Sequence, residues 1–176
     1  MQRFTCRLCT WLALVGASAA LGGCGLFAYF PRYEDVTNDP EFCGELRRGQ
    51  VYRLSQPAFM YTGFNLSMVS RPEGVNNPDG TPAVPDSVQE YDSSPDRWPG
   101  VKGVVPVGTH FEIRRMTHES GINYSVVEVK AKVVNGPFRG RTVDVDQLLI
   151  SEGSPALTGQ RVRRADPHWL TRPHRQ

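Results

Sequence analysis

Hydrophobic and polar residues alternate most regularly in the second half of the chain. In residues 109–117, Phe111 and Ile113 share one parity and charged residues occupy the other. Residues 127–133 alternate in the same way, with valine and alanine on one parity and glutamate or lysine on the other. Because successive side chains of a strand point to opposite faces, each stretch predicts a strand with one buried face.

A third strand is predicted over residues 142–146, after a turn at residues 135–140 that contains asparagine, proline and two glycines. Its valines would face inward, and Asp144 and Asp146 would face solvent about 7 Å apart. Strands that follow one another through tight turns form an antiparallel meander. The second half therefore predicts an antiparallel sheet.

The segment 122–134 contains a change of parity. Ile122, Tyr124 and Val126 share one parity, whereas the apolar residues from Val127 onward share the other. A one-residue shift exchanges the two faces of a strand, so the pattern predicts a β-bulge or a register break between Val126 and Val127.

The first half has shorter apolar runs. Residues 51–54 and 64–69 predict strands, and residues 58–61 predict either a further strand or a connecting turn. Residues 71–103 contain six prolines, and proline lacks the N–H that a central strand needs. We therefore expect a long Pro/Gly-rich loop there, with Trp98 packing back onto the core.

Together these elements predict an all-β fold of five to seven short strands. A small antiparallel barrel would remove exposed strand edges. The Val105-Pro106-Val107-Gly108-Thr109 turn, the hairpin after it and the closing segment 143–149 resemble bacterial SH3-like barrels over about residues 48–151. The resemblance implies a small SH3-like barrel with the long loop inserted.

The N-terminus has the three parts of an export signal. Residues 1–7 are basic, and residues 8–21 form an uncharged apolar stretch of 14 residues, whereas a spanning helix needs about 20. The stretch ends in Leu21-Gly22-Gly23-Cys24, which resembles the bacterial lipobox. The resemblance implies cleavage between Gly23 and Cys24, and attachment of a diacylglyceryl group and then a fatty acid such as palmitate to Cys24.

Gly25 follows the cysteine in place of the aspartate that commonly retains lipoproteins in the inner membrane. The resemblance therefore implies an outer-membrane lipoprotein that faces the periplasm. The alternative is an ordinary secretory signal cut near Ala17-Ser18-Ala19, with Cys24 incidental. We expect a signal peptide at residues 1–23, a membrane-proximal linker at 24–47 and a barrel domain at 48–176.

Charge narrows the possible partners. Cleavage removes Arg3 and Arg7 from 20 Lys and Arg, leaving 18 against 18 Asp and Glu, so the mature net charge is zero. A strongly basic domain would indicate binding to nucleic acid. The mature chain is not basic, so we expect no nucleic-acid partner. Residues 161–176 hold five arginines against Asp166, so this basic tail is either solvated or touches lipid headgroups or an acidic partner.

The sequence shows no standard catalytic or metal-binding motif, and we expect no enzyme activity, no cofactor and no metal site. The spacing of His110 and His118 does not suit a metal. Asp144 and Asp146 could bind a cation or act as an acid–base pair, but alternating aspartates are typical of the wet face of a strand. Cys43 is the only thiol left after lipidation, and burial is the expected state of such a cysteine.

Three functions follow as hypotheses. The first is a lipid-anchored, non-enzymatic binding or scaffold protein that meets an envelope protein partner. The second is a peptidoglycan-binding SH3-like module with an aromatic groove; its candidate residues are Tyr52, Tyr61, Trp98 and Tyr124. The third is an envelope hydrolase that uses Asp144, Asp146 or a histidine.

Overall fold

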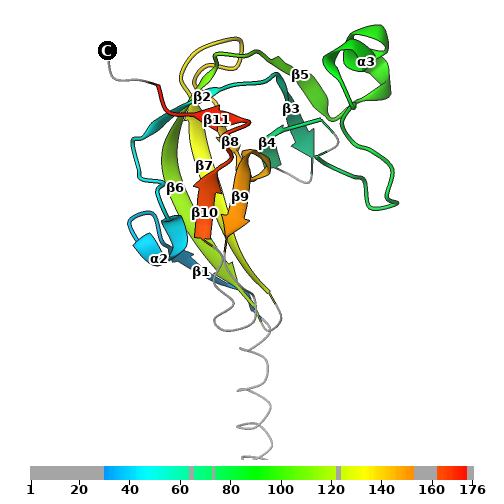
Figure 1. The fold of residues 1–176 in the computed structure, drawn as a ribbon. Coiled ribbons are helices and arrows are strands. Elements are labelled where there is room, and N and C mark those ends of the chain that lie inside the picture. Colours follow the sequence, from blue (N-terminus) through cyan, green and yellow to red (C-terminus); the bar gives the residue numbers. More distant parts are fainter. Residues whose placement is uncertain (1–29, 64–65, 73, 122–123, 153–161, 174–176) are drawn as a thin grey trace, which may run out of the picture.

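The computed structural model describes residues 30–63, 66–72, 74–121, 124–152 and 162–173. Within these residues the chain is mostly β-strand, which confirms the all-β prediction (Figure 1). The elements in chain order are β1 (Arg32–Asp35), α2 (Pro40–Cys43), β2 (Val51–Leu54), β3 (Ala58–Gly63), β4 (Leu66–Ser70), α3 (Val88–Ser93), η1 (Pro95–Arg97), β5 (Val101–Val105), β6 (His110–Ser120), β7 (Ser125–Val133), β8 (Thr142–Asp144), η2 (Asp146–Leu148), β9 (Leu149–Glu152), β10 (Val162–Ala165) and β11 (Leu170–Thr171). In this part of the chain, no helix is long and apolar enough to cross a membrane.

One large sheet dominates the fold, and β9 and β10 form a second, two-stranded sheet. The large sheet runs in the order β11-β2-β6-β7-β8-β4-β3-β5, and β1 pairs with β6. Strand β6 pairs with β2 near His110 and with β1 near Ser120, so two strands share one of its edges while β7 occupies the other. Strand β4 pairs with β8 in parallel, through Met68 and Asp144.

The predicted closed barrel is wrong, because the sheet is open. Strands β11 and β5 stand at the two ends of the strand order. Closure is one of several ways to protect a strand edge, and short or charged edge strands are others. Here β11 has two residues, and β5 carries the exposed Lys102. The edges of this sheet are thus protected by short length and charge.

The longest feature is the β6–β7 ribbon, which the alternation predicts (Figure 1). The predicted register break between Val126 and Val127 is wrong, because both residues pair with β6 in unbroken register. The irregularity lies instead on β6, between Ile113 and Arg115. Val126 keeps its parity and is simply 38% exposed. An apolar residue on the outer face produced the apparent change of parity.

The main core lies against the inner face of this ribbon. Ile113, Met116 and Val129 are among its fully buried residues. Val36, Cys43 and Leu46 belong to the same core, so the linker predicted over residues 24–47 is wrong in its second half. The strand that opens this segment, β1, is exposed at every position. Without a buried face it shows no alternation by which sequence analysis could detect it.

A second hydrophobic cluster lies beneath the Pro/Gly-rich segment. Its buried residues are Phe59, Tyr61, Ala83, Val84, Trp98 and Val101. The expected return of the chain at Trp98 is confirmed, since this side chain is 5% exposed. The segment 71–103 is more ordered than the predicted loop, because it contains α3, η1 and the start of β5. The serine cap of α3, in which Ser87 Oγ accepts a hydrogen bond from Glu90 N, helps to start that helix.

The C-terminal segment is not a free basic tail. Strand β10 pairs with β9, and β11 pairs with β2. Leu170 is buried in the main core and Trp169 packs against it, as expected for a segment that covers one end of the domain. Arg172 Nη2 lies 3.5 Å from Glu45 Oε2, whereas Arg161 and Arg175 lie outside the described residues. Backbone pairing and two apolar side chains therefore hold this basic segment on the domain.

Candidate functional site

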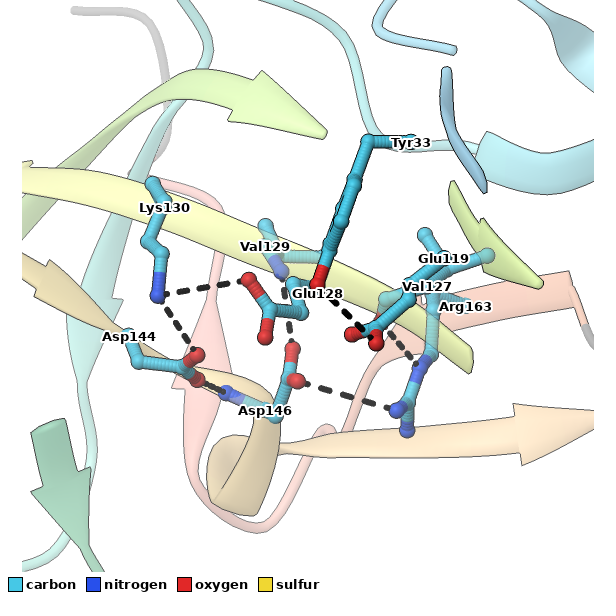
Figure 2. A network of polar contacts seen from close by, with 9 residues as sticks. All are labelled: Tyr33, Glu119, Val127, Glu128, Val129, Lys130, Asp144, Asp146 and Arg163. Atoms are coloured by element: carbon cyan, nitrogen blue, oxygen red, sulfur yellow. Dashed lines mark hydrogen bonds and ion pairs between the residues drawn. The ribbon is translucent and has the colours of Figure 1, made fainter. Parts of the chain in front are cut away.

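Charged side chains from β7, β8, η2 and β10 converge at one corner of the fold (Figure 2). We call Glu128, Lys130, Asp144, Asp146 and Arg163 the acid–base cluster. The prediction that Asp144 and Asp146 point to solvent is wrong, because Asp144 is 6% exposed and Asp146 is largely buried. Asp144 lies on the outer face of the sheet, opposite Lys130 of β7. Beyond the end of β8, η2 and β10 lie along the free edge of β7, where Asp146 and Arg163 contact the backbone of Val129 and Val127.

Asp146 connects η2 to the middle strand of the sheet. Its Oδ1 accepts a hydrogen bond from Val129 N at 2.9 Å. Its Oδ2 lies 3.8 Å from Arg163 Nη2. Burial and the charge of Asp144 raise the pKa of Asp146 from 3.8 to about 7, and the Arg163 charge opposes the rise. This carboxyl therefore changes charge near neutrality.

Asp144 is held between a backbone donor and a cation. Its Oδ1 accepts a hydrogen bond from Asp146 N at 2.8 Å, which forms a local turn. Its Oδ2 lies 3.1 Å from Lys130 Nζ, and Glu128 Oε2 lies 3.6 Å from the same nitrogen. Burial opposes the charge of Lys130, but the nearby carboxylates outweigh it and raise the lysine pKa. Lys130 therefore stays charged between two acids.

Arg163 fastens the small sheet to the large one. Its Nε donates to Val127 O at 3.0 Å, and its Nη1 donates to Ser151 Oγ at 2.7 Å. The guanidinium thus reaches β7, β9 and Asp146 at once, a use for which its fork of donors is suited. This arginine was expected to be solvated or to face lipid or a partner, yet its side chain is 15% exposed.

The charged groups of the acid–base cluster bind partners within the protein. Each oxygen of Asp144 and Asp146 faces a backbone N–H or a cation of this chain. A catalytic carboxylate needs to reach a substrate proton, whereas these carboxylates join strands. Within the described residues, no three His, Cys, Asp or Glu side chains are grouped so that they could hold a metal ion. The geometry favours a structural clamp.

The four aromatic residues considered for a binding groove do not lie together. Tyr52 is 2% exposed in the main core, while Tyr61 and Trp98 are buried in the second cluster. Tyr124 is 46% exposed and lies beside the β6–β7 turn. Trp98 Nε1 is buried and has no hydrogen-bond partner among the described residues. The structure thus brings together only Tyr61 and Trp98.

An exposed polar group that sequence analysis missed lies at the end of the ribbon. Tyr33 of β1 and Tyr124 both donate their hydroxyl hydrogens to Glu119 Oε1, at 3.2 and 2.8 Å. Figure 2 shows the Tyr33 hydroxyl beside the Glu119 carboxylate, close to the acid–base cluster. The only sequence signal was Tyr124 itself, which shares its parity with the exposed Val126.

The remaining candidate side chains have structural partners. Cys43 is buried, as expected, and its thiol donates to Val36 O at 2.7 Å, while burial raises the pKa of the thiol. His118 Nε2 lies 2.9 Å from Ser125 Oγ, and its ring lies 4.5 Å from the Phe42 ring. His110 pairs with Arg53 across β2 and β6. Gly23 and Cys24 lie outside the described residues.

Comparison with known proteins found no matching family model, no matching curated protein and no matching solved structure.

Proposed function

We propose that this chain is a lipid-anchored protein of the bacterial envelope that acts as a non-enzymatic binding or scaffold module for an envelope protein. The observation that carries the proposal is the sequence Leu21-Gly22-Gly23-Cys24 after an uncharged apolar segment. Acyl chains on Cys24 would hold the domain at the membrane, because two or more chains anchor stably where one does not. By resemblance the anchor lies in the outer membrane, facing the periplasm.

Two features of the folded domain support a binding role over catalysis. The carboxylates of the acid–base cluster are turned to partners within the chain. The cluster also ties together β7, η2 and the β9–β10 sheet, which makes a rigid support for surface contacts. A rigid β domain on a short tether suits a protein that holds or positions another.

The lipid anchor is tested by metabolic labelling of the full chain with a clickable palmitate analogue. Wild type and Cys43→Ala should label equally, because Cys43 is buried in the core, whereas Cys24→Ala should lose the label and accumulate as a precursor. The Cys43 variant is the matched control for removal of one thiol. Equal labelling of Cys24→Ala and wild type would refute the anchor.

A peptidoglycan-binding module is the second candidate, and one observation favours it. The Trp98 indole N–H is buried without an acceptor among the described residues, a state that costs free energy unless a ligand or water supplies one. A distant relation to bacterial SH3-like domains is part of this candidate. This relation rests on the sequence of the Val105–Thr109 turn and of segment 143–149. The sheet to which these segments belong is open.

Co-sedimentation of the full chain with purified sacculi tests this candidate. Trp98→Phe is the sharp variant, because it removes the N–H and keeps most of the ring that fills the second cluster. Wall binding predicts that wild type sediments and that Trp98→Phe does so much less, with unchanged thermal unfolding. Equal sedimentation of the two proteins would exclude Trp98 as the contact.

A further inference from the structure

The end of the β6–β7 ribbon carries an unusual concentration of exposed apolar side chains. Phe30 and Tyr33 are each 65% exposed, Tyr124 is 46% exposed and Val126 is 38% exposed. These four are most of the large exposed hydrophobic residues in the described part of the chain, the others being Val107 and Val134. We call Phe30, Tyr33, Tyr124 and Val126 the ribbon-end patch.

Strand register brings three of these residues to one face. Tyr33 of β1 lies opposite Glu119 of β6, and Glu119 lies opposite Val126 of β7. Residues directly opposed in antiparallel strands point to the same face. Tyr33 and Val126 therefore flank Glu119 on the outer face, and Tyr124 reaches the same carboxylate from the turn.

The Glu119 carboxylate in the middle of the patch is shielded by its neighbours. Both tyrosine hydroxyls donate to its Oε1. A carboxylate that already has hydrogen-bond donors loses less when water around it is removed. Each tyrosine in turn presents an aromatic ring with its hydroxyl already satisfied. The patch can thus enter a less polar environment with its central charge solvated by the protein.

The tether places this patch next to the membrane. Five residues separate Cys24 from Phe30, so their Cα atoms lie at most about 20 Å apart. Residues 24–31 contain no charged side chain and include Leu26, Phe27 and Tyr29. An uncharged, aromatic connection favours the headgroup region over a water-filled gap. Val107 lies beyond the opposite end of β6, which is roughly 35 Å long.

We propose that the ribbon-end patch docks into the headgroup layer of the membrane that holds the Cys24 lipid, so that the domain stands on the end of the β6–β7 ribbon. The inference rests on the proposed lipid anchor. Aromatic rings with polar tips favour the membrane–water interface. The neighbouring charges of β1 are Arg32, Glu34 and Asp35, so there is no basic excess to attract anionic lipid. Docking therefore depends on the aromatic side chains and not on lipid charge.

The test uses the full lipidated protein in phosphatidylcholine vesicles, with and without bromine on the acyl chains as a contact quencher of tryptophan. Tyr124→Trp reports on the patch, and Val107→Trp is the matched exposed position at the far end of the ribbon. Wild type supplies the background from Trp98 and Trp169. We expect the added emission of Tyr124→Trp to fall at least about twofold in brominated vesicles, as for an interfacial ring, and that of Val107→Trp to stay unchanged.

Two further arms make the test decisive. Adding Phe30→Glu to Tyr124→Trp should abolish the quenching while the protein remains on the vesicles, and raising NaCl to about 0.5 M should leave the quenching intact. An acylated Tyr124→Trp that is not quenched, or is quenched no more than Val107→Trp, overturns docking and leaves the anchor standing. Mass spectrometry that finds no acyl group on Cys24 overturns the anchor, and the docking proposal with it.

Discussion

The acid–base cluster and the ribbon-end patch use carboxylates in opposite ways. In the cluster, Asp144 is buried and Asp146 is largely buried, and both take their donors from backbone N–H groups, lysine and arginine. In the patch, Glu119 lies among exposed residues and takes its donors from two tyrosine hydroxyls. Glu119 of the patch and Glu128 and Lys130 of the cluster lie on the same face of the β6–β7 ribbon (Figure 2).

The difference between them is what covers the sheet. Beside β7, beyond the end of β8, η2 and the β9–β10 sheet contact the strand edge through Asp146 and Arg163, so the carboxylates there are sheltered and their charges must be paired. Over the end of the ribbon nothing in the described chain covers Tyr33, Tyr124 or Val126. The first region therefore contributes to stability, and the second is available for an external contact.

The largest expected effect is the pH dependence of stability that Asp146 confers. Its pKa is about 7 in the folded chain against 3.8 for the ordinary carboxyl. Between these values the folded state binds more protons, so the free energy of unfolding falls as pH rises from about 4 to about 7, by up to about 4 kcal/mol, and then levels. The measurement is urea unfolding across this range, with Asp146→Asn as control.

Asparagine cannot ionise and keeps an oxygen for Val129 N. The difference in stability between wild type and Asp146→Asn should therefore carry the pH dependence. Parallel curves for the two proteins would show that Asp146 does not titrate in this range, and the electrostatic difference from the half-buried Glu119 would not hold.

A smaller effect is expected from Asp146→Ala. At about pH 5 this change leaves the Val129 N–H without an acceptor, which should cost about 2 kcal/mol. Asp146→Asn should lose less than half of that, since the amide oxygen can accept the same hydrogen bond. Urea unfolding of the three proteins measures both values. If alanine and asparagine lose the same amount, the hydrogen bond to β7 is not what the side chain contributes.

The smallest effect is expected at the ribbon end. Glu119→Gln keeps an oxygen for Tyr33 and Tyr124 and removes a partly exposed charge outside the core, so the stability should change by less than about 0.5 kcal/mol. Thermal unfolding of the variant beside wild type checks this. A loss as large as that of Asp146→Ala would mean that Glu119 belongs to the structural network, and the two regions would no longer differ in kind.

Sequence periodicity predicted the strands with one buried face. Strands β6 and β7, the turn after β7 and the inward Val143 follow from alternation, because burial selects one parity. Strand β1 was missed since its four residues are all exposed and it is held by backbone pairing to β6.

The candidate site was harder to predict for a related reason. The alternation of apolar and polar residues correctly placed Asp144 on the outer face of the sheet, where it lies opposite Lys130. It could not show that a later segment lies beside the edge of β7 and that its Arg163 reaches Asp146. The open sheet was missed in the same way, because strand edges can be protected by short length as well as by closure.

The pairing of β1 with β6 also has a mechanical consequence. Strand β1 begins opposite Ser120 at the ribbon end and runs back along β6 to Thr117. With the proposed lipid on Cys24, a pull on the N-terminal segment directed away from the ribbon end would act along the axis of both strands. The interstrand hydrogen bonds are then loaded together in shear, and not opened one after another. A domain anchored in this way would resist a force from a moving partner better than a domain attached through a strand whose hydrogen bonds break one after another.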